Sequence, residues 1–204
     1  MQTRHPVPYY SQWESAELVG EFIEGVLSAS ADPRWASSDA SSPQEYEFWS
    51  WRTCGIACLR MVLAHRGMAV PAAVPLAEEC AAAGGYVRHP DRVDGLIYAP
   101  FVAWIAERFG IKATVRAELP VAEISERVHD GGLAMISVHP WIRWLDRTPP
   151  KAGGHLVLVT GAGPGHLLIH NPSGLPGHSQ QHARIALDAL NRFYAGRGVL
   201  IDPP

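Results

Sequence analysis

The hydrophobic pattern changes along the chain, from helical spacing in the first half to short apolar runs in the second. Helical spacing predicts helices over residues 14–28, 54–65, 72–83 and 98–109. The short apolar runs predict strands over residues 111–115, 134–138, 155–160, 167–171, 183–187 and 198–201. Helices followed by a mainly antiparallel sheet are typical of the α+β class. We therefore expect one α+β domain over residues 1–204, with a helical N-terminal lobe packed on the sheet.

Cys54 begins the most apolar of the predicted helices, in which Arg60 is the only interior charge. A helix that is apolar on nearly all sides is expected to run through the centre of the protein. A cysteine in its first turn lies near unpaired backbone N–H groups and the positive end of the helix dipole, which favour a thiolate. Cys54 is therefore a candidate nucleophile. We interpret Cys58 and Cys80 as buried hydrophobic side chains.

A second candidate group lies in the hairpin predicted around the glycine-rich residues 161–165. If Thr160 faces His166 across this loop, the antiparallel register sets His155 opposite Asn171. Facing side chains have Cβ atoms about 4.5–5.5 Å apart, so an amide oxygen can orient an imidazole. A single histidine at the start of a strand is more often structural, but a nucleophile, a base and an orienting residue together favour catalysis.

Four segments of the chain carry a further resemblance. They are Val7-Pro8-Tyr9-Tyr10-Ser11-Gln12-Trp13, residues 53–63, residues 153–161 and Asn171-Pro172-Ser173. With these segments the chain resembles a papain-like cysteine peptidase of the bacteriocin-processing, double-glycine leader peptidase type and its stand-alone relatives.

The resemblance implies a papain-like fold with a central catalytic helix, and it implies a role for each candidate residue. Cys54 would be the nucleophile, His155 the base and Asn171 the residue that orients the base. Gln12 would donate a hydrogen bond in an oxyanion hole beside the Cys54 backbone N–H, and Gln44 is the second candidate for that donor. Many members carry aspartate where Asn171 stands, but asparagine can accept the same N–H from histidine.

Charge and cysteine content narrow the classes of partner. The net charge of −3 is scattered along the chain, so we expect neither nucleic acid nor a membrane as a partner. Residues 1–6 lack the apolar stretch of a signal peptide, and no run approaches about 20 apolar residues, so we expect a soluble, cytoplasmic protein. Three cysteines suit a reducing compartment and do not complete a zinc site, so no metal or other cofactor is expected.

The expected chemistry is attack of the thiolate on an acyl carbon, followed by hydrolysis of the thioester acyl-enzyme. The sequence thus predicts a cysteine peptidase or amidase that acts on a peptide or small amide. Two alternatives remain open. The same thioester could pass its acyl group to an amine, as in an acyltransferase or transpeptidase, or the chain could be a non-catalytic peptide-binding domain. The substrate and the oligomeric state are also open.

Overall fold

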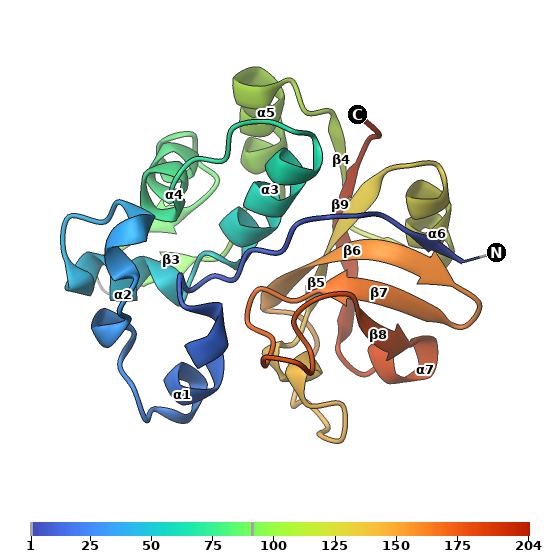
Figure 1. Ribbon diagram of the computed structural model, residues 1–204. Coiled ribbons are helices and arrows are strands. Elements are labelled where there is room, and N and C mark those ends of the chain that lie inside the picture. Colours follow the sequence, from blue (N-terminus) through green and yellow to red (C-terminus); the bar gives the residue numbers. More distant parts are fainter. Residues whose placement is uncertain (1, 91) are drawn as a thin grey trace.

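The computed structural model describes residues 2–90 and 92–204 of the 204-residue chain. Figure 1 shows helices from the first half of the chain on one side of the molecule and a curved sheet on the other. The first side holds α1 (Val19–Glu24), α2 (Pro43–Ser50), α3 (Cys54–His65), α4 (Ala73–Ala82) and α5 (Tyr98–Phe109). Two further helices lie against the sheet, α6 (Val121–His129) and α7 (Leu187–Leu190).

The main sheet is antiparallel, with the strand order β4-β9-β5-β6-β7-β8 and with β1 paired to β6 outside this path. Its strands are β1 (Thr3–Arg4), β4 (Ala113–Arg116), β5 (Leu133–Val138), β6 (His155–Gly163), β7 (His166–His170), β8 (Ala183–Ala186) and β9 (Tyr194–Ile201). A separate two-stranded sheet joins β2 (Val87–Arg88) to β3 (Val93–Asp94). The predicted α+β class is confirmed.

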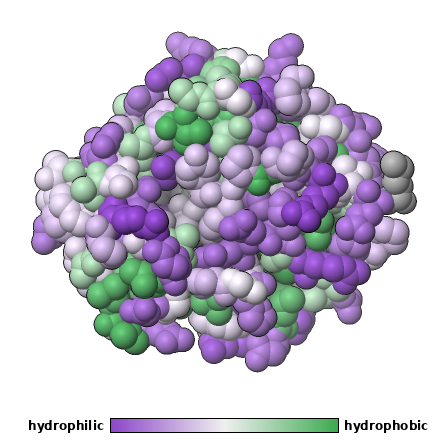
Figure 2. All heavy atoms as spheres, viewed as in Figure 1, coloured by the Kyte–Doolittle hydropathy of each residue, from purple (hydrophilic) through white to green (hydrophobic). Residues whose placement is uncertain are grey.

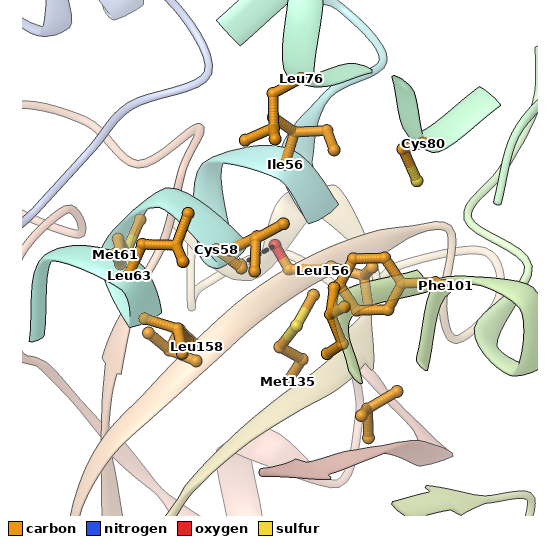
Figure 3. Close-up of a cluster of buried hydrophobic side chains, with 14 of the residues drawn as sticks. Ile56, Cys58, Met61, Leu63, Leu76, Cys80, Phe101, Met135, Leu156 and Leu158 are labelled. Carbon is orange, nitrogen blue, oxygen red and sulfur yellow. Dashed lines mark hydrogen bonds between the residues drawn. The ribbon is translucent and has the colours of Figure 1, made fainter. Parts of the chain in front are cut away.

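The central strands β5 and β6 are buried on both faces, because helices cover each side of the sheet. On one face, α3, α4 and α5 pack against side chains that include Leu156 and Leu158. Figure 3 shows Cys58 of α3 beside Leu156 of β6, and its thiol lies 3.8 Å from the Leu156 carbonyl oxygen. On the other face, α6 contributes Ile124 and Val128. The packing of α3 on β6 holds the N-terminus of the helix near the start of the strand.

Some predicted boundaries were wrong. The helix predicted over residues 14–28 is a 3-10 turn followed by the short α1, because Gly25 takes a left-handed conformation with φ of 72°. The helices α2, α6 and α7 and the short strands β1, β2 and β3 were not predicted. Local capping explains α2, since Pro43 occupies its first turn and the Ser42 side chain accepts a hydrogen bond from the Glu45 N–H.

The predicted register of the β6–β7 hairpin was also wrong. The strands continue to Gly163 and His166, so only Pro164 and Gly165 form the turn. An irregularity beside Val159 then shifts the register, and His155 pairs with Val138 of β5. A bulge of this kind adds one unpaired residue and cannot be counted from a loop length.

Polar side chains cover most of the face in Figure 2, and the apolar side chains between them form small separate groups. Among the described residues, no helix has both the length and the apolar character needed to cross a lipid bilayer.

Candidate active site

Cys54 is the first residue of α3 and is partly exposed, whereas the residues from Gly55 to Leu63 are buried. Gly55 allows the end of the helix to pack closely against its surroundings. A Cβ at this position would lie 2.8 Å from Leu96 Cδ2 and 3.2 Å from the Tyr86 hydroxyl. The close packing leaves the Cys54 side chain as the part of this helix end that meets an open cleft.

The cleft has a volume of about 700 Å³ and lies where the helical side meets the sheet. Cys54, His155 and Gln12 all line it, although they are far apart in the sequence. Asn171 is fully buried and lies behind His155. The structure therefore brings Cys54, His155 and Gln12 to one cleft and places Asn171 in contact with His155.

The imidazole of His155 is held from one side. Its Nε2 lies 2.8 Å from Oδ1 of Asn171, and that oxygen also accepts a hydrogen bond from the Ser173 N–H. Because an amide oxygen only accepts, this contact requires a proton on Nε2 and leaves Nδ1 as the basic nitrogen. The Ser173 hydroxyl oxygen lies 3.1 Å from the same Nε2.

Asn171 reaches His155 from just beyond the end of β7, and the contact does not come from the predicted pairing. Leu158 pairs with His170, and continuing this register would set Ser173 across from His155. The turn after β7 is closed by hydrogen bonds from the Gly174 N–H and the Tyr9 hydroxyl to the Asn171 carbonyl oxygen. These bonds fix the turn that directs the Asn171 amide toward the imidazole.

Electrostatics at the site differ from the sequence expectation of a resting thiolate. Burial raises the pKa of the Cys54 thiol, and backbone N–H groups of Leu156, Gly55 and Cys54 itself lower it by a smaller amount. The helix terminus thus acts in the predicted direction, but desolvation outweighs it. Burial, followed by the positive charge of Arg143, lowers the pKa of His155 to about 3. At neutral pH this favours a neutral thiol and a neutral imidazole at the cleft.

The two glutamines named in the sequence occupy different environments. Gln12 is 7% exposed, and its Nε2 donates a hydrogen bond to the Ser50 carbonyl oxygen over 2.8 Å. One N–H of the same nitrogen remains for another acceptor. The backbone N–H of Gln12 also donates to the Pro172 carbonyl oxygen, which ties this segment to the turn that follows Asn171. Gln44 is exposed and does not line the cleft.

Two functional candidates were missed in the sequence. Ser173 contacts both His155 and Asn171, and Arg143 donates a hydrogen bond from Nη2 to the Ser173 hydroxyl oxygen over 2.7 Å. Ser173 follows the asparagine by two residues, so the correct register would have nominated it. Arg143 is the last residue of a short 3-10 helix after β5. It is not part of a recognisable sequence motif, so no signal in the sequence points to it.

Cys58 and Cys80 are fully buried in the hydrophobic core, which confirms their interpretation as packing residues. All three cysteines are free thiols. In the part of the chain that the structure describes, no cluster of three or more His, Cys, Asp or Glu side chains is arranged to hold a metal ion.

Comparison with known proteins gives matches among solved structures alone, since neither a family model nor a curated protein matches the sequence. A C39-like peptidase candidate from Bacillus anthracis is 11% identical, with a TM-score of 0.61 over 100% of this chain and 98% of the other. A double-glycine motif protease from an AMS/PCAT transporter, in complex with the leader peptide, is 16% identical, with a TM-score of 0.52 over 100% and 99%.

The peptidase domain of Streptococcus ComA, a bifunctional ABC transporter of a quorum-sensing pathway, is also 16% identical. Its TM-score is 0.50, over 76% of this chain and 93% of the other. Identities this low support a statement about the fold alone. This chain has the papain-like fold of the C39 peptidase domains, as its sequence resemblance predicted.

Proposed function

We propose that this chain is a cysteine peptidase or amidase that hydrolyses a peptide or small amide through a thioester on Cys54. The observation that carries the proposal is the 2.8 Å contact between His155 Nε2 and Asn171 Oδ1, at the edge of the cleft that Cys54 also lines. A free thiol, a base with one nitrogen held and a buried amide acceptor are the parts that acyl transfer requires. A peptidase fold around these residues supports the same chemistry.

The first half of the reaction forms the acyl-enzyme. His155 Nδ1 takes the proton of the Cys54 thiol while the sulfur attacks the substrate carbonyl carbon. The carbonyl oxygen becomes negative, and it would accept hydrogen bonds from the Cys54 backbone N–H and from the free N–H of Gln12. The imidazolium then gives its proton to the leaving amine as the carbon–nitrogen bond breaks.

The second half regenerates the enzyme. His155 removes a proton from water, the resulting hydroxide attacks the thioester carbon, and the carbon–sulfur bond breaks. The proton returns to the Cys54 sulfur as the acid product leaves. The leader peptide bound to the double-glycine motif protease supports a peptide as the substrate class. The preference for a double-glycine motif is a property of that protease and is not carried over to this chain.

One observation favours the alternative of a non-catalytic peptide-binding domain. Burial disfavours both the Cys54 thiolate and the His155 imidazolium, and therefore disfavours the ion pair typical of reactive thiols. In an enzyme, substrate binding would have to offset this cost. A direct assay of acylation distinguishes the two functions.

The test uses p-nitrophenyl acetate and intact-mass spectrometry, followed by peptide mapping. The wild-type chain is expected to gain one acetyl group at Cys54 and then lose it to water. Cys54→Ala should remove the modification, His155→Ala should slow it, and Cys58→Ala, which removes a buried thiol, should leave it unchanged. If His155→Ala is acetylated as fast as the wild type, or if all three thiols are acetylated, the proposed enzyme activity is wrong. A non-catalytic peptide-binding domain is then the better interpretation.

A second assay establishes that peptides are substrates. A mixture of synthetic peptides is incubated with the wild-type chain and with Cys54→Ala, and new termini are identified by mass spectrometry. Cleavage that disappears in the variant supports a peptidase. Addition of hydroxylamine then separates hydrolysis from acyl transfer, because an acyltransferase gives hydroxamate in preference to acid. If hydroxamate is the main product at millimolar hydroxylamine, the chain is an acyltransferase and the proposed hydrolase activity is wrong.

A further inference from the structure

The charge of the cleft is opposite to the charge of the chain. The sequence holds 20 acidic and 17 basic Lys and Arg residues. Yet the cleft is lined by Arg52, Arg143, Arg147 and Arg197, with neither aspartate nor glutamate among its described lining residues. Charges of one sign in a concave, partly desolvated site focus the electrostatic field and attract the opposite charge. The distribution favours an anionic ligand.

Among the arginines that line the cleft, Arg143 is the one with a buried guanidinium nitrogen that has no hydrogen-bond partner within the described residues. Arg143 is 8% exposed, its Nη2 donates a hydrogen bond to the Ser173 hydroxyl oxygen, and its guanidinium lies 5.2 Å from the centroid of the Trp144 ring. Its Nε is buried and has no hydrogen-bond partner. Within residues 2–90 and 92–204, no carboxylate lies within ion-pair distance of this guanidinium. Buried arginines normally have a counter-ion, since desolvation of an unpaired charge is costly.

The position of Arg143 relates its charge to the reaction centre. The Ser173 hydroxyl oxygen accepts from Arg143 over 2.7 Å and lies 3.1 Å from His155 Nε2. The guanidinium is therefore one side chain away from the imidazole, and it borders the same cleft. A ligand group that reaches Arg143 would be part of a molecule that also lies along His155 and Cys54.

We propose that the cleft selects ligands that carry a carboxylate, which binds to Arg143, while Arg197 adds attraction from another wall of the cleft. The planar guanidinium suits a carboxylate because two parallel N–H groups can donate to its two oxygens. The carboxylate can be an Asp or Glu side chain of a peptide or the free C-terminus of a short peptide. The proposal refines the substrate class of the proposed peptidase and rests on that function only for turnover, because binding itself needs no nucleophile.

A bound carboxylate would also change the electrostatics of the base. Burial is the largest cause that disfavours the His155 imidazolium; among the neighbouring groups, the charges of Arg143 and His139 also disfavour it and the Asn171 amide favours it. A carboxylate on Arg143 would offset the largest of these repulsions. An anionic substrate would thus raise the pKa of His155 at the moment when a base is needed.

The test measures binding to Cys54→Ala, so that no turnover interferes. Three synthetic probes are titrated with tryptophan fluorescence as the readout, because Trp13, Trp51, Trp141 and Trp144 line the cleft. The first is acetyl-Gly-Gly-Glu-Gly-Gly-amide, the second replaces glutamate by glutamine, and the third is the glutamine peptide with a free C-terminal carboxylate. One of the carboxylate peptides is expected to bind about tenfold tighter than the neutral peptide.

Variants then assign the preference to a residue. Arg143→Gln in the Cys54→Ala background should abolish the difference between the acidic and neutral peptides. Arg108→Gln makes the same charge change on an exposed arginine of α5 and should preserve the difference. Because Arg143 is buried, each variant is checked by circular dichroism. Arg197→Gln, at an exposed position, provides a second test and should reduce the preference even if Arg143→Gln does not fold.

The outcomes separate this proposal from the proposed function. Equal binding of all three peptides, or a preference that survives both arginine substitutions, would overturn the carboxylate site. The identity of the tighter peptide assigns the carboxylate to a side chain or to a C-terminus. The binding measurements use the Cys54→Ala variant and do not depend on catalysis. If the wild type shows neither acetylation nor peptide cleavage, the proposed peptidase activity is contradicted, but the proposed carboxylate site is not.

Discussion

Asn171 accepts a hydrogen bond from His155 although the two residues are not paired in the sheet. His155 starts β6 and pairs with Val138, whereas Asn171 lies one residue beyond the end of β7. The contact therefore depends on the turn that follows β7. The contact gives Nε2 an acceptor and leaves Nδ1 as the basic nitrogen that can take a proton from Cys54.

Replacement of Cys54 by alanine should abolish peptide hydrolysis and preserve the fold. The side chain is partly exposed and lines the cleft, so its removal leaves the core of α3 intact. Loss of a nucleophile typically lowers kcat by more than about 10³-fold. Steady-state cleavage and thermal unfolding measure the two effects. Residual cleavage above about a tenth of the wild-type rate would show that another group attacks the substrate.

Asn171 offers a matched pair of substitutions. Asn171→Ala removes the acceptor for His155 Nε2 and should lower kcat by about 10²–10⁴-fold, because the imidazole loses its orientation and tautomer. Asn171→Asp keeps an acceptor in place and adds a negative charge, so it should retain far more activity and raise the pKa of His155. The pH profile of kcat/KM compares the two. Equal losses in both variants would show that the amide has a purely structural role.

His155 should make the fold less stable in acid. Its pKa falls from 6.5 to about 3 on folding because the side chain is buried, so the unfolded state binds more protons between these values. The stability contributed by the neutral imidazole is therefore lost as the pH falls below about 6.5, and the loss reaches about 2 kcal/mol by pH 5.

Urea unfolding of the wild type and of His155→Gln at pH 7 and pH 5 isolates this contribution. The wild type should lose about 2 kcal/mol more than the variant over this interval. His178→Gln, a change at an exposed histidine outside the cleft, serves as the control and should behave like the wild type. If His155→Gln has the same acid dependence as the wild type, the imidazole is not held in its neutral form by burial.

The two glutamines also form a natural comparison. Gln12→Ala should lower kcat by about 10²–10³-fold if its free N–H stabilises the oxyanion. It should also cost about 1 kcal/mol of stability, since the hydrogen bond to the Ser50 carbonyl oxygen is lost. Gln44→Ala changes an exposed side chain away from the cleft and should affect neither quantity. Measurements of kcat and of urea unfolding test both variants, and an unchanged kcat in Gln12→Ala would remove the residue from the oxyanion hole.

Much of the fold was accessible from local pattern. The helices predicted over residues 54–65, 72–83 and 98–109 agree closely with α3, α4 and α5, because each combines helical periodicity with a stop signal that acts over a few residues. Hydrophobic runs located β4 to β8 and the end of β9 in the same way, but they did not indicate the two-residue strands β1, β2 and β3. The bulge beside Val159 could not be predicted from the sequence, because an unpaired residue depends on how the two strands pair and has no signature within either strand.

The sequence by itself determined which residue types stand at the start of α3, at the start of β6 and just after β7, because element boundaries depend on local periodicity and capping. Only the tertiary structure decided how these residues interact. Burial raises the pKa of the Cys54 thiol, opposite to the effect expected of the helix terminus, and the turn after β7 directs Asn171 toward His155. The tertiary structure also buries Arg143 beside Ser173. Desolvation, register and pairing of charges depend on segments that meet only after folding, and no local pattern of the chain encodes them.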